Sequence, residues 1–88
     1  MNNKKILLIP YGMSFLLGLK EGTECEIIEF SEKLSINLKR RLLSLGFVCG
    51  TKVKVLKYSL KKKTILLELR NYVLTVESNI CAEIKVKV

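Results

Sequence analysis

The second half of the chain is a succession of short segments with the composition of β-strands. Val53 and Val55 alternate with Lys52 and Lys54, so one face of that segment is expected to be buried and the other wet. The predicted strands in this half are 51–58, 64–70, 72–76 and 84–88. Strands this closely spaced in a small chain favour a closed or half-closed barrel, because closure removes exposed edges.

One further strand is predicted earlier, at 24–30, where apolar and polar residues also alternate. Its alternation places Cys25 and Ile27 on one face, and Ile28 and Phe30 on the other. Upstream, the spacing within 14–19 fits one helical turn, with Leu16 and Leu19 on a shared face. The chain does not alternate strands with helices as a parallel sheet requires.

A single longer helix is predicted at 36–45, between the first strand and the later four. Ser35 is a suitable N-cap, and Gly46 is the expected left-handed residue that ends the helix. Leu38, Leu42 and Leu45 form one apolar stripe, so the helix is expected to pack through that side.

The length of 88 residues fits one small domain, which has little room for an elaborate active site. It lacks histidine, the commonest general base and transition-metal ligand, so neither an enzyme nor a metal site is expected. Its three cysteines, Cys25, Cys49 and Cys81, show no paired spacing. We expect them to be reduced packing residues in a cytosolic protein.

The net charge is +8, with sixteen Lys and Arg against eight Glu. Such an excess favours an acidic partner: nucleic acid, an anionic membrane surface or an acidic protein face. A surface that serves only solubility is the alternative.

The N-terminal segment 6–19 carries no charge and follows two lysines, the order found in signal peptides. No small-residue cleavage site follows, and the segment is too short and too interrupted to span a membrane. We therefore predict an extension at 1–9 and a barrel domain at 10–88. The apolar residues 6–9 are expected to pack on the barrel or to pair with an edge strand.

The most specific stretch, 41–51, reads RLLSLGFVCGT. It predicts a helix end, a left-handed glycine, an apolar residue that folds back, a second glycine turn and entry into a strand. An ordinary helix-to-strand connection with no function of its own would show the same features. The stretch resembles the FeoA family, with matching residues Arg41, Leu42, Gly46, Gly50 and Thr51. Cys49 departs from that pattern, because the family usually has proline there.

The resemblance implies an SH3-like β-barrel with one α-helix inserted after the first barrel strand. It also implies a non-catalytic accessory protein of bacterial ferrous iron uptake that binds and modulates FeoB, the membrane GTPase and ferrous permease. Transition metal ion binding is a property of the family, but no metal ligand and no cofactor is assigned in this chain. The expected location is the cytoplasm, peripheral at the inner face of the membrane; a homo-oligomer remains open.

Candidate partner-binding residues come from the basic surface and from the end of the helix. Lysines at a hairpin tip are exposed by geometry and should hold the domain at the membrane or against an acidic face of FeoB. Phe47 and Val48 are the candidates for specific contact, although core packing is the stronger expectation for Phe47. The full set is Lys39, Arg40, Phe47, Val48, Lys61, Lys62 and Lys63.

The main alternative is a small basic barrel that binds nucleic acid. Stacking on bases requires aromatic residues among the basic ones, and here Tyr58 lies near Lys57 and Lys61 while Tyr72 lies near Arg70. Only these two tyrosines lie among basic residues, so we consider nucleic acid a less favoured partner than a protein.

Overall fold

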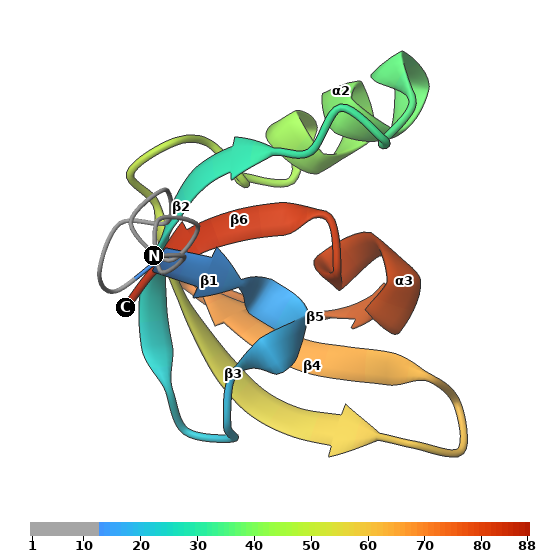
Figure 1. The fold of residues 1–88 in the computed structure, drawn as a ribbon. Helices are drawn as coiled ribbons and strands as arrows, with labels where there is room; N and C mark the ends of the chain where they lie inside the picture. Colours follow the sequence, from blue (N-terminus) through green and yellow to red (C-terminus); the bar gives the residue numbers. More distant parts are fainter. Residues whose placement is uncertain (1–12) are drawn as a thin grey trace, which may run out of the picture.

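The computed structural model describes residues 13–88 and shows a strongly curved antiparallel sheet (Figure 1). A three-residue 3-10 helix, η1, follows the first strand; the longer helix α2 lies beyond one end of the sheet, and the short helix α3 precedes the last strand. The elements are β1 (Met13–Phe15), η1 (Leu16–Gly18), β2 (Glu24–Phe30), α2 (Ile36–Ser44), β3 (Lys52–Ser59), β4 (Thr64–Leu69), β5 (Tyr72–Glu77), α3 (Ser78–Cys81) and β6 (Ile84–Lys87).

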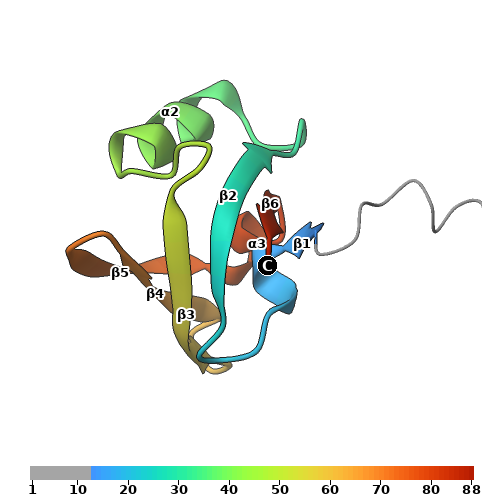
Figure 2. The same ribbon diagram turned by 90° about the vertical axis from the view of Figure 1, so that its left-hand side faces the viewer.

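The six strands are hydrogen-bonded in the order β1-β6-β2-β3-β4-β5. The sheet curls into a half-open barrel, and within residues 13–88 its two edges, β1 and β5, are not joined by hydrogen bonds (Figure 2). The mainly β, SH3-like fold class is confirmed. The inserted helix is α2, and it follows β2, the first of the long strands.

Two β-bulges reset the alternation of buried and exposed residues along the strands. Pairing shifts between Ile27 and Glu29 on β2, and between Val55 and Lys57 on β3. An extra residue moves every later side chain to the opposite face. Phe30 therefore packs against the same core as Ile27, and its predicted place on the other face was wrong.

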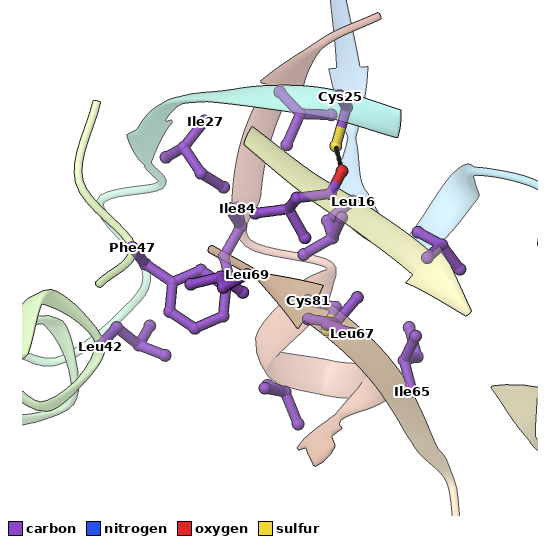
Figure 3. Packing of buried hydrophobic residues seen from close by; sticks show 14 of the residues in the cluster. Leu16, Cys25, Ile27, Leu42, Phe47, Ile65, Leu67, Leu69, Cys81 and Ile84 are labelled. Carbon is purple, nitrogen blue, oxygen red and sulfur yellow. Dashed lines mark hydrogen bonds between the residues drawn. The ribbon is translucent and has the colours of Figure 1, made fainter. Parts of the chain in front are cut away.

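The core lies inside the curve of the sheet and is almost entirely aliphatic (Figure 3). Phe47 is the largest fully buried side chain, and its ring lies beside Leu42 and Leu69. Of the other two phenylalanines, Phe30 is half-buried and Phe15 is 43% exposed. Phe15 lies on the edge strand β1, outside the core.

Sequence reasoning missed β1 and α3, which have three and four residues. The N-terminal extension predicted at 1–9 lies outside the described residues. Among residues 13–88, no helix has the length and apolar character needed to cross a membrane.

Candidate partner-binding surface

The stretch 41–51 forms the tight connection that its two glycines predict. Gly46 has a φ of +108°, and its N–H donates to the carbonyl of Leu43, with N and O 3.0 Å apart. The N–H of Phe47 donates to the carbonyl of Leu42, also at 3.0 Å. This pair of bonds is a Schellman motif, which satisfies carbonyls that the end of the helix leaves free. The predicted positive φ of Gly46 is confirmed.

The second half of the stretch is fastened to β2. Gly50 has a φ of +94°, and its N–H donates to the carbonyl of Ile27 at 2.8 Å. The Ile27 N–H donates in return to the carbonyl of Thr51 at 2.9 Å. Thr51 is the one buried polar residue among those described, whereas Arg41 is exposed. Gly46, Gly50 and Thr51 thus have structural roles in this turn.

Phe47 and Val48, the candidates for specific contact, differ in their exposure. Phe47 is fully buried and presents no surface to a partner, so its place is the core. Val48 is half-buried next to the exposed Cys49.

Lys61, Lys62 and Lys63 are all exposed in the turn between β3 and β4. The turn is held to the neighbouring connection, because the Ser78 N–H donates to the Lys63 carbonyl at 2.9 Å. The preceding Leu60 is 89% exposed, the most exposed large apolar residue in the described part of the chain. The hairpin tip therefore presents one apolar side chain followed by three ammonium groups.

Beside the hairpin tip lies a solvent-open cavity of about 860 Å³, which sequence reasoning did not foresee. Its apolar lining includes Leu17, Tyr58 and Leu60, and its polar lining includes Lys62, Lys63, Glu77 and Asn79. The Tyr58 hydroxyl shares its one proton between the backbone carbonyls of Leu17 and Leu19, which fixes η1 and its C-cap against β3. We call this cavity, together with Leu60 and the three lysines, the tip hollow.

The other basic candidates, Lys39 and Arg40, lie on α2. Figures 1 and 2 both place this helix at the end of the molecule opposite the β3–β4 tip. The candidate residues therefore form two separate basic surfaces, not one.

The cysteines divide into two kinds. Cys25 and Cys81 are buried, and burial raises the pKa of the Cys25 thiol to about 11 and that of the Cys81 thiol to about 12. Cys49 is exposed, so its predicted packing role was wrong. Cys49 lies between the turns at Gly46 and Gly50, which keep it outside the core. Among the described residues, no three Cys, Asp or Glu side chains gather as metal ligands would.

We expect a thiol reagent at neutral pH to modify one cysteine per folded chain, Cys49, and all three after denaturation. The thiolate is the form that reacts. At Cys25 and Cys81, burial blocks access of the reagent and the raised pKa keeps the thiolate scarce. Mass spectrometry of the modified protein measures the count. Cys49→Ser is the control and should leave the folded chain unmodified; rapid modification of Cys81 would contradict its burial.

The sequence matches the model of the FeoA domain over residues 16–88. No protein of curated function matches it. Among solved structures, the FeoA protein from Chlorobium tepidum has 29% identity and a TM-score of 0.78, with 85% of this chain and 70% of that chain covered.

Two more distant structures share the fold. The FeoA-like protein from Clostridium acetobutylicum has 20% identity and a TM-score of 0.76, with 90% of each chain covered. A manganese-dependent transcriptional repressor in complex with manganese has 16% identity and a TM-score of 0.80, with 90% of this chain and 37% of the repressor covered. The family model spans most of the sequence, and the chain belongs to the FeoA domain family.

Proposed function

We propose that the protein is a non-catalytic accessory factor of ferrous iron uptake that binds and modulates the permease and GTPase FeoB. Family membership supports the link to ferrous iron transport. The observation that carries the proposed contact is the tip hollow, where exposed apolar side chains meet three lysines. On this proposal the protein works in the cytoplasm, at the inner face of the membrane.

The tip hollow suits a protein segment that combines apolar and acidic side chains. Leu17 and Leu60 are left partly in water, and an apolar side chain of the partner would remove that surface from solvent. The lysines supply a positive rim, with Glu77 the only carboxylate in the described lining. Rim charges of this kind accelerate association and exclude like-charged partners, whereas the apolar contact supplies most of the affinity.

A role without catalysis agrees with the composition. The chain has no histidine, and burial moves the pKa of the Cys25 and Cys81 thiols still further above neutral pH. No base therefore stands ready to activate a nucleophile among these groups.

The arrangement of the aromatic side chain beside the hairpin tip gives little support to nucleic acid binding. Tyr58, the aromatic residue nearest the lysine run, is half-buried, and its hydroxyl is bonded to the backbone of η1. Such a ring is not a free platform for stacking on bases. Strong, salt-sensitive binding of the purified chain to plain DNA or RNA would nevertheless favour this alternative.

The direct test is retention of detergent-solubilised FeoB on the immobilised chain. Detergent removes the bilayer, so retention reports contact between the two proteins. Absence of FeoB from the bound fraction, with the domain shown to be folded, would refute the proposed function.

Replacing Lys61, Lys62 and Lys63 with Gln is expected to weaken this binding roughly tenfold, through slower association. The salt dependence of the association rate should also become shallower. The matched control replaces Lys52, Lys54 and Lys57, three exposed lysines of β3, and removes the same charge. Equal losses in the two triple variants would mean that only net charge matters and that the tip hollow is not the contact.

A further inference from the structure

We propose that the outer face of α2 docks on an anionic lipid bilayer. This helix packs on the domain mainly through one side: Leu42 is its only buried residue, and Leu38 and Lys39 are half-buried. The other six residues of the helix are exposed, and the helix lies at one end of the molecule (Figure 2).

The outer face carries an apolar pair that packing within the domain does not explain. Ile36 is 62% exposed and Leu43 is 47% exposed. Seven residues apart, they lie two turns from each other on one side of the helix. This side is distinct from the one that holds Leu38 and Leu42.

Basic residues lie on either side of this apolar pair. At 100° per residue, Lys39 falls on one flank of the line from Ile36 to Leu43, and Arg40 on the other. The helix also carries Arg41 and has no acidic residue. The arrangement is that of an interfacial helix, whose apolar residues enter the boundary of the acyl chains while its cations meet lipid phosphates.

The two basic surfaces differ in shape, and this difference assigns them different partners. Leu60 lines a cavity, which a protruding side chain of a protein can fill. The outer face of α2 is the convex side of a helix at the end of the molecule, and a flat, extended, anionic surface can contact its whole length. With α2 on the bilayer, the tip hollow would point away from the membrane.

The experiment measures cosedimentation of the purified chain with vesicles of phosphatidylcholine, with and without phosphatidylglycerol, in the absence of FeoB. The expected result is binding that requires phosphatidylglycerol and weakens with added salt. The variant Lys39→Gln with Arg40→Gln should bind roughly tenfold or more weakly, because each cation near an anionic surface contributes a several-fold factor. The variant Ile36→Gln with Leu43→Gln should also lose binding.

Glutamine is a good helix former, and all four positions are at least partly exposed, so the variants should keep the fold; thermal unfolding checks this. Two matched controls alter the far end and the sheet: Lys61→Gln with Lys62→Gln, and Leu60→Gln with Val73→Gln. Both should bind vesicles as the unaltered chain does.

The proposal is overturned if phosphatidylglycerol does not increase vesicle binding of the unaltered chain. It is also overturned if the α2 variants bind vesicles as strongly as the unaltered chain, or if the control variants lose as much vesicle binding as the α2 variants. Loss of FeoB retention in detergent by the α2 variants, with vesicle binding intact, would also overturn it by assigning this face to a protein. Because no FeoB is present on the vesicles, the result is independent of the proposed function.

Discussion

Replacing Phe47 with Ala is expected to lower the free energy of unfolding by about 3–5 kcal/mol. The side chain is fully buried, and its ring lies between the end of α2 and the sheet, near Leu42 and Leu69 (Figure 3). Truncation removes this contact and leaves a cavity that the Schellman turn prevents the backbone from closing. Small domains are stable by only about 5–15 kcal/mol, so the loss is a large part of the total. Urea denaturation followed by circular dichroism measures it.

Phe15→Ala is the matched control, since it removes the same atoms from the exposed edge strand β1. Its cost should stay within about 1 kcal/mol, as for most surface substitutions. Similar costs for the two variants would show that Phe47 is not the residue that joins α2 to the barrel.

The long strands and the helix could be predicted because each buries one face, and burial imposes a period on the sequence. The bulges could not be predicted. At Ile28 and Leu56 nothing in the residue types distinguishes an extra residue in one strand from regular pairing. Phe30 and Tyr58 lie beyond these bulges, and both pack against the core.

The shortest elements carry too few residues to show a period. β1 is recognised as a strand only through its pairing with β6, where Ser14 lies opposite Val86. Tertiary contact, not local preference, creates such a strand.

Of the candidate site, the sequence predicted the exposed lysines of the hairpin tip but not the cavity beside them. That cavity brings together Leu17, Tyr58 and Asn79, which come from three distant parts of the chain. The one local signal was Leu60, an apolar residue directly before three lysines in a turn, where a polar residue is usual. The assignment of Phe47 to the core succeeded for a local reason, because the residue after a left-handed glycine commonly folds back onto its helix.

Gly46→Ala is expected to cost about 2–3 kcal/mol of unfolding free energy, for two separable reasons. The φ of +108° is one that residues with a Cβ rarely adopt. An added Cβ would also lie 3.3 Å from the Tyr72 hydroxyl oxygen and 3.4 Å from Cδ2 of Leu69. The first of these contacts is tight enough that the Tyr72 side chain must shift. Denaturant titration of the variant measures the sum of both effects.

Two other glycines separate the dihedral cost from the crowding. Gly50 has a φ of +94° with open space around its missing Cβ, so Gly50→Ala should cost only the dihedral part, about 1–2 kcal/mol. Gly18 also has open space and no positive φ, so Gly18→Ala should be neutral or stabilising by up to about 1 kcal/mol. The expected order of stability is therefore Gly18→Ala, then Gly50→Ala, then Gly46→Ala. If Gly46→Ala were no worse than Gly50→Ala, the contact with Tyr72 would contribute nothing, and β5 would not restrain the end of α2 through this residue.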